Sequence, residues 1–183
     1  ELRRSQNWIG GTRPGNAVFV PPPPERVADL LADLERFVHD VASDVPPLVK
    51  VALIHAQFET IHPFLDGNGR IGRLLIAALF EYWSLLREPL LYLSGYLKQH
   101  QGEYYRRLST IRSAGDWEGW VSFFLEGVAT AAADAERSII DVASLITADR
   151  RRLLQSPNAG PVSYRLFEML PLMPRFAVDH ARH

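Results

Sequence analysis

The sequence predicts an all-α helical bundle that carries one short β-hairpin near its N-terminus. From residue 25 to residue 154, apolar side chains recur at every third or fourth position with charged side chains between them, the pattern of amphipathic helices. Proline and glycine divide this pattern into helix-length segments, and no strand-rich region follows residue 20. Because strands and helices do not alternate, a parallel-sheet fold is excluded and a helical bundle is favoured.

The first residues predict the hairpin. Two short runs, 7–9 and 17–20, flank a segment rich in Gly, Pro and Asn, which form turns. The proline run 21–24 cannot donate ladder hydrogen bonds, and its last member suits the first turn of a helix. We therefore expect residues 1–24 to form a hairpin flap and a proline spacer.

Residues 25–154 are expected to form the helical core. Pro46 and Pro47 open its second helix, and Pro63 closes it near His62 because the residue before proline avoids the α region. Glu88-Pro89 closes the next helix, and Gly127 weakly interrupts the last one. The expected helices are 25–41, 46 to about 62, 70 to about 86, 103–112 and 116 to about 154.

The amino-acid composition excludes several classes of function. Lys plus Arg number 20 and Asp plus Glu number 21, so no positive excess draws the whole domain to nucleic acid. The absence of Cys excludes disulfides, cysteine-bound metal and thiol catalysis, and it favours a reducing, cytoplasmic compartment. Apolar runs fall short of the ~20 residues that a membrane span needs, so no membrane partner is expected.

The run from residue 62 to residue 73 concentrates the unusual chemistry. Gly67 and Gly69 permit positive φ values, at which successive backbone N–H groups point into one concavity. The helix expected to begin at Arg70 adds the positive end of its dipole at the same place. We therefore expect an anion site here, most simply for phosphate.

Side chains of the same run suit phosphate chemistry. Arg70 and Arg73 lie one helical turn apart and can both donate to one polyphosphate. Asp66 at the loop entrance is suited to a divalent cation, and Asn68 supplies an amide donor. His62 can act as a general base toward an attacking hydroxyl.

Three other interpretations use the same residues. Residues 67–72 match G-x-G-x-x-G, but a dinucleotide-binding loop follows a strand and this one follows a helix. His55, Glu59 and His62 share a helix face and form a candidate zinc site. The third interpretation is a purely structural turn. In it, His62 caps the helix and both arginines pair with surface carboxylates such as Glu59.

The run resembles the defining motif of Fic-domain proteins, H-P-F-x-[D/E]-G-N-G-R-x-x-R, and matches every specified position. The similarity covers the chain from Arg3 to Leu154 and implies a Fic-type helical bundle. Its other similar segments are residues 6–11, 58–61, 103–105 and 115–120.

This resemblance implies a protein adenylyltransferase, which transfers AMP from ATP to a Ser, Thr or Tyr hydroxyl of a target protein and releases pyrophosphate. Phosphorylating relatives have Lys in the middle of the loop, where Gly69 stands here. The implied roles are His62 as general base, Asp66 as Mg²⁺ ligand, Gly67, Asn68 and Gly69 at the α-phosphate, and Arg70 and Arg73 at the β- and γ-phosphates.

Two further groups gain roles from the resemblance. Ile9, Gly10 and Gly11 of the flap would lie beside the target backbone, as in strand addition; covering the core is the structural alternative. Tyr104 and Tyr105 would flank the nucleoside, and an aromatic pair in helix packing is the structural alternative.

The resemblance also frames regulation and the C-terminal end. No inhibitory [S/T]-x-x-x-E-[G/N] motif occurs in the sequence, so an inhibitory helix would have to precede Arg3, and its removal would raise activity. Residues 155–183 are either a tail on the bundle or the truncated start of a winged-helix domain, the one route to nucleic acid. A homodimer, AMP removal, another phosphate-containing donor and a non-catalytic nucleotide sensor stay open.

Overall fold

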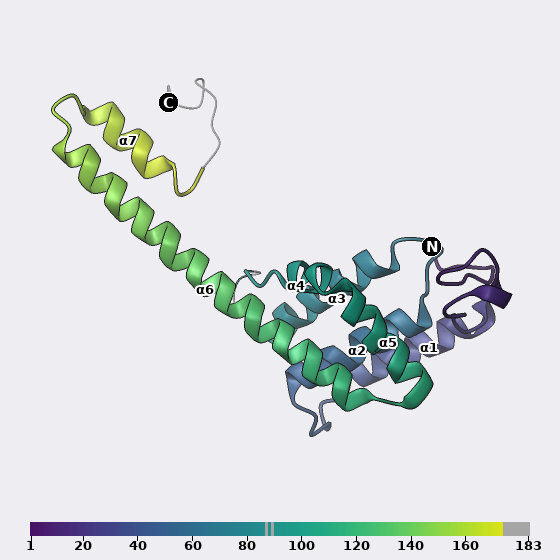
Figure 1. Cartoon of the computed structure of the whole chain (residues 1–183). Helices are drawn as coiled ribbons and strands as arrows, with labels where there is room; N and C mark the ends of the chain where they lie inside the picture. The colour runs from purple at the N-terminus through teal and green to yellow at the C-terminus, as the bar shows by residue number, and fades with distance from the viewer. Residues whose placement is uncertain (87, 89, 174–183) are drawn as a thin grey trace. The chain divides into compact units, whose positions relative to one another are not determined.

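A computed structural model describes residues 1–86, 88 and 90–173. Its contacts divide the chain into two units, Glu1–Ala132 and Ala133–His183. Figure 1 shows the element order, with α-helices and two short 3-10 helices (η) and, within the described residues, no β-strand. The elements are η1 Pro14–Asn16, η2 Pro24–Arg26, α1 Val27–His39, α2 Pro47–Ile61, α3 Asn68–Tyr82, α4 Leu93–Gln99, α5 Gln101–Ala114, α6 Trp117–Gln155 and α7 Pro161–Met169.

The first unit is built around α2. This helix packs against α1 on one side and α3 on the other (Figure 1), and its apolar residues are buried around most of its circumference. Trp120 of α6 is fully buried and donates its indole N–H to the carbonyl of Ala52 at 2.8 Å. Helix α2 is therefore the central helix, because its polar side chains do not form one face that could lie against solvent.

Proline places the helix boundaries as expected. Pro24 opens η2 and Pro47 opens α2. The second of these helices ends at Ile61, and His62 follows in the left-handed region with φ 49°. This sharp turn before Pro63 directs the chain into the loop 62–67.

The end of α3 differs from the sequence expectation. Helix α3 ends at Tyr82 rather than about residue 86, because Ser84 adopts φ 54° and the amide of Leu85 turns back to the carbonyl of Phe80 at 2.8 Å. The closure expected at Glu88-Pro89 includes Pro89, which lies outside the described residues.

Helix α6 is continuous through Gly127, so the expected weak break there is wrong. A Cβ atom at Gly127 would lie 2.6 Å from the ring of Tyr96, which shows that glycine serves close packing between α6 and α4. The C-terminal segment 155–183 contains α7, and its residues 174–183 lie outside the described residues.

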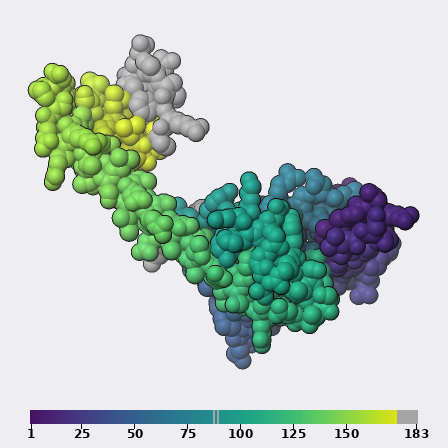
Figure 2. Space-filling view, viewed as in Figure 1, coloured from purple at the N-terminus to yellow at the C-terminus, as the bar shows by residue number. Residues whose placement is uncertain are grey.

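The flap, residues 7–20, is a loop with one β-bridge rather than a hairpin. Ile9 and Phe19 form an antiparallel bridge, with the amide of Ile9 2.8 Å from the carbonyl of Phe19. The ladder stops there because Gly10 and Gly11 adopt φ 68° and 69°, far from the extended region, and η1 fills the rest of the connection. The space-filling view shows this N-terminal segment in purple against the rest of the first unit (Figure 2).

The second unit contains residues 133–155 of α6 and the whole of α7. An ion pair of 3.7 Å between Arg150 and Glu168 connects the two helices. Over the stretches that the structure describes, no helix combines the length and hydropathy that crossing a membrane would require.

Candidate active site

The loop 62–67 joins the C-terminus of α2 to the N-terminus of α3, and the side chain of Asn68 holds it closed. Asn68 is 2% exposed. Its Oδ1 accepts the amide of Phe64 at 2.8 Å, and its Nδ2 donates to the carbonyl of Phe64 at 2.7 Å. The predicted amide donor is thus largely engaged in bracing the loop.

The two loop glycines serve different purposes. Gly67 caps α3 with φ 85°, as expected. Gly69 does not have a positive φ, contrary to expectation, because it already belongs to the first turn of α3. A Cβ atom at Gly69 would lie 3.2 Å from Nη1 of Arg73, so this glycine leaves room for the guanidinium.

Backbone amides face the loop at the start of α3. Within the described residues no side chain caps this helix, which leaves the amides of Asn68, Gly69 and Arg70 as donors that the helix itself cannot satisfy. The amide of Gly67 donates to Oδ1 of Asp66 at 2.7 Å. A helix N-terminus with unpaired amides favours an anion.

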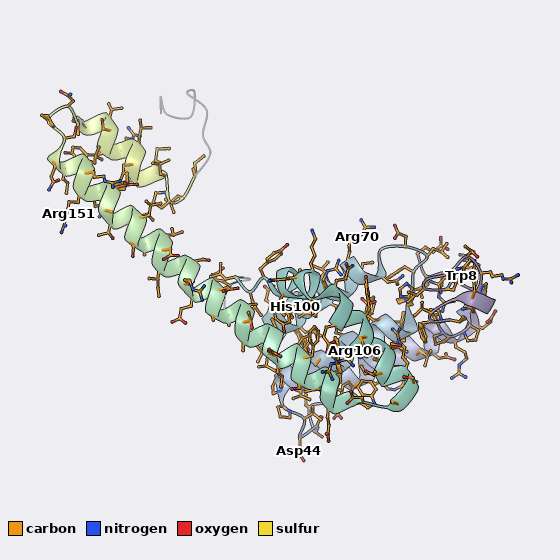
Figure 3. All side chains as sticks on the ribbon, in the orientation of Figure 1. Trp8, Asp44, Arg70, His100, Arg106 and Arg151 are labelled. Carbon is orange, nitrogen blue, oxygen red and sulfur yellow. The ribbon has the colours of Figure 1, made fainter. Side chains whose placement is uncertain are left out.

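The two motif arginines differ in their partners. Arg70 pairs with Asp66 at 3.2 Å, and both side chains are largely exposed. Figure 3 shows Arg70 at the surface of the first unit. Arg73 makes no ion pair or hydrogen bond with the part of the chain that the structure describes, so its guanidinium is available to a ligand.

Arg73 opens onto a cavity that also brings together the two predicted nucleoside residues. The cavity measures about 310 Å³. Tyr104 is buried and Tyr105 is 56% exposed, so only the second presents much of its ring to solvent. The lining residues are Arg73, Tyr92, Ser94, Leu97, Lys98, Gln101, Tyr104 and Tyr105, with two cations and no carboxylate among them.

His62 lies at the loop entrance in an environment that favours its neutral form. Burial lowers the pKa of His62; the carbonyl of Glu59 opposes this effect, and the charges of Arg112 and Arg3 add to it. Its Nδ1 atom is shielded from solvent without a hydrogen-bond partner among the described residues. A neutral imidazole is the form that accepts a proton.

Arg3, which the sequence did not single out, caps the end of α2 beneath His62. Its side chain is buried, and its Nε donates to the carbonyl of His62 at 3.0 Å. A second hydrogen bond reaches the carbonyl of Ile61 at 3.5 Å. The guanidinium of Arg3, rather than the His62 ring, donates to the carbonyls of Ile61 and His62.

His55 is a structural residue. Its Nδ1 lies 3.1 Å from the carbonyl of Gly72 and its Nε2 lies 3.0 Å from the hydroxyl of Tyr104. Since a carbonyl only accepts, Nδ1 carries the hydrogen and Nε2 accepts from Tyr104. Burial lowers the pKa of His55 from 6.5 to about 4; the bond to Gly72 opposes this, and Arg73 adds to it.

This arrangement excludes the zinc interpretation. Both ring nitrogens of His55 are engaged, and the described residues contain no group of three or more His, Cys, Asp or Glu placed to hold a metal ion. The loop also follows a helix and precedes a helix, so the dinucleotide-binding interpretation of residues 67–72 is wrong as well.

Glu59 is buried beside the loop and is not the surface partner that the structural alternative required. Burial raises the pKa of Glu59, while Arg112 and Arg73 oppose the shift. Its Oε1 has no hydrogen-bond partner among the described residues. A Cβ atom at Gly72 would lie 2.7 Å from that oxygen, so glycine is required where α3 passes Glu59.

These features define a helical domain with a loop whose free backbone amides favour an anion, with His62 at one end of the loop and Arg73 available beside it. Residues 1–80 match the Fic/DOC family. The chain therefore contains a Fic/DOC family domain.

Similar proteins agree with this assignment. The protein adenylyltransferase Fic of Drosophila virilis is 31% identical over 176 residues, which cover 91% of this chain and 31% of that protein. The protein of the same name from Drosophila ananassae is 34% identical over 132 residues, or 69% of this chain and 23% of that protein. The chain thus spans about a third or less of the length of these relatives.

A solved structure supports the fold. The crystal structure of a Fic family protein from Desulfovibrio desulfuricans G20 is similar with a TM-score of 0.63 and 33% sequence identity. The similarity covers 75% of this chain and 41% of that one.

Proposed function

We propose that this domain is a protein adenylyltransferase, which transfers AMP from ATP to a hydroxyl side chain of a target protein. The observation that carries the proposal is the loop 62–67, which has a neutral His62 at one end and free α3 amides at the other. The uncommitted Arg73 adds a cation beside the same loop. The names of the Drosophila relatives support this activity.

In the proposed reaction, the target hydroxyl attacks the α-phosphorus of ATP while His62 accepts the hydroxyl proton. A phosphoester bond forms to the target oxygen, the α–β phosphoanhydride bond breaks, and pyrophosphate leaves. The amides of Asn68 and Gly69 face the developing negative charge, and Arg70 and Arg73 bind the departing phosphates. Such a displacement depends mainly on orientation and charge stabilisation.

Mg²⁺ belongs to the proposal, and the loop fits it. Asp66 presents an exposed carboxylate near the end of the loop. Mg²⁺ in nucleotide sites is commonly held by one or two carboxylates together with substrate phosphates. Asp66 would hold the ion, which neutralises phosphate charge when bound.

We also propose that the flap aligns the target and that Tyr105 contributes to nucleoside binding. Trp8 and Val18 are 40% and 75% exposed, so the flap presents apolar side chains near Ile9, Gly10 and Gly11. Tyr105 lines the same cavity as Arg73. The hydroxyl of Tyr104 is committed to His55, so Tyr104 would contribute only its ring.

Incubation with ATP and Mg²⁺, followed by intact-mass analysis, tests the proposal on this chain and on candidate target proteins. We expect a gain of one AMP per modified hydroxyl with the wild-type chain and none with His62→Ala. Isothermal titration calorimetry must show that His62→Ala still binds ATP. Retained binding without any transfer by the wild-type chain would favour a nucleotide sensor instead.

A further inference from the structure

Arg112 of α5 lies between three parts of the first unit. Its guanidinium carbon is 3.8 Å from the centroid of the Phe19 ring in the flap. Its Nη2 donates to the carbonyl of Glu59 at 3.2 Å, and its Nε donates to Oγ1 of Thr60 at 3.4 Å. One side chain therefore joins α5, the last turn of α2 and the flap.

These contacts use the particular geometry of a guanidinium. A planar cation can stack on an aromatic ring and donate from its edge at the same time, whereas an ammonium group has no plane to stack. Phe19 is the flap residue that bridges to Ile9, so anchoring its ring also anchors the bridge. The two α2 acceptors come three and two residues before His62.

The same position, on the carbonyl of Glu59 and the hydroxyl of Thr60, places a positive charge at the end of α2 that precedes His62. The charged groups that act on His62 come from two elements, Arg112 from α5 and Arg3 from the N-terminal segment. Both disfavour protonation of the ring, while the carbonyl of Glu59 favours it. Arg3 caps the carbonyl of His62 directly, whereas Arg112 stacks on Phe19 of the flap.

We propose that Arg112 is a positioning residue that fastens the flap to the end of α2 and keeps His62 in its proton-accepting form. The proposal rests on the proposed AMP transfer, since it gives His62 and the flap their roles. Arg112 does not touch the reacting atoms. It sets the charge around the base and the placement of the segment that would align the target.

The chain offers variants that separate the two effects. Arg112→Gln removes the charge and the stacking, and Arg112→Lys retains the charge but not the planar fork. Phe19→Leu removes the ring and leaves Arg112 in place. Arg106→Gln is the matched control, because Arg106 lies on the same helix (Figure 3), is exposed and pairs with Glu103 at 2.5 Å.

Two measurements need no activity. Nuclear magnetic resonance titration of labelled histidine, assigned with His62→Gln, reports the protonation of His62. Hydrogen exchange of the Ile9 and Phe19 amides reports flap opening, with about fivefold faster exchange expected when an anchor is lost. Circular dichroism first establishes that each variant is folded.

Arg112→Gln should raise the pKa of His62 and speed exchange of the flap amides. Arg112→Lys and Phe19→Leu should speed exchange but leave the His62 titration as in the wild type. Arg106→Gln should change neither. If either quantity is unchanged in Arg112→Gln, or if Arg106→Gln changes them equally, the proposal is overturned.

Kinetic measurements then test whether the role of Arg112 affects AMP transfer. Arg112→Gln should shift the acidic limb of the pH–rate profile to higher pH, because His62 would remain protonated up to a higher pH. Arg112→Lys should keep that limb and raise KM for the target protein more than it lowers kcat. If the wild-type chain transfers no AMP, the proposed function fails, while the titration and exchange results still decide the role of Arg112.

Discussion

His55 predicts a specific loss of stability in acid. The buried ring has a pKa lowered from 6.5 to about 4, chiefly by burial. In the unfolded chain this ring takes up a proton as the pH falls through about 6.5, but in the folded chain it does so only near pH 4. The contribution of neutral His55 to the free energy of unfolding is therefore fully present above about pH 6.5 and is progressively lost as the pH falls toward 4.

The size of the loss follows from the pKa difference. One unit corresponds to about 1.4 kcal/mol, so the full effect is about 3 kcal/mol, and most of it is reached by pH 4.5. Net stabilities of single domains are about 5–15 kcal/mol, so this loss is a large part of the total.

Urea unfolding between pH 4.5 and pH 7.5 measures it. His55→Gln can still donate to the Gly72 carbonyl but cannot titrate, so its free energy of unfolding should fall by about 2–3 kcal/mol less over this range than that of the wild type. His100→Gln is the control, because His100 is exposed at the surface. Parallel curves for the wild type and His55→Gln would refute the reasoning.

Three other substitutions and one control substitution have defined outcomes. Arg3→Ala should lower the free energy of unfolding in urea by about 2–4 kcal/mol, because charged hydrogen bonds to the end of α2 are lost. The control Arg4→Ala, at an exposed site, should change the same free energy by less than about 0.5 kcal/mol. Gly67→Ala should cost about 1–2 kcal/mol because its φ is 85°; equal denaturation midpoints would contradict this explanation. Arg73→Ala should leave stability within about 0.5 kcal/mol and weaken ATP binding by about tenfold or more in calorimetry, and unchanged affinity would remove Arg73 from the phosphate site.

The helices were predictable because their signals are local. Apolar spacing and the prolines at the first positions of η2 and α2 give their starts directly. The end of α3 was not predictable, since Ser84 adopts a positive φ that its residue type does not favour. Continuity through Gly127 depends on the ring of Tyr96, which is distant in sequence.

The chemistry of the loop was also predictable, because its residues form one local motif. The distant residues that contact this loop were not predictable. The motif places His62, the capping Gly67 and Arg73 within one short run. The partners of that run come from elsewhere: Arg3 reaches the carbonyl of His62 across 59 residues, and Arg112 reaches Glu59 across 53. No local pattern reports a contact at such separation.

The central claim is AMP transfer, and the position of the transferred phosphorus tests it most directly. The chain, Mg²⁺ and a target protein are incubated with ATP labelled either at the α- or at the γ-phosphorus, and the protein is then separated from nucleotide. We predict label on the protein from α-labelled ATP only, and none with His62→Ala. Label from γ-labelled ATP would mean phosphoryl transfer and would contradict the account.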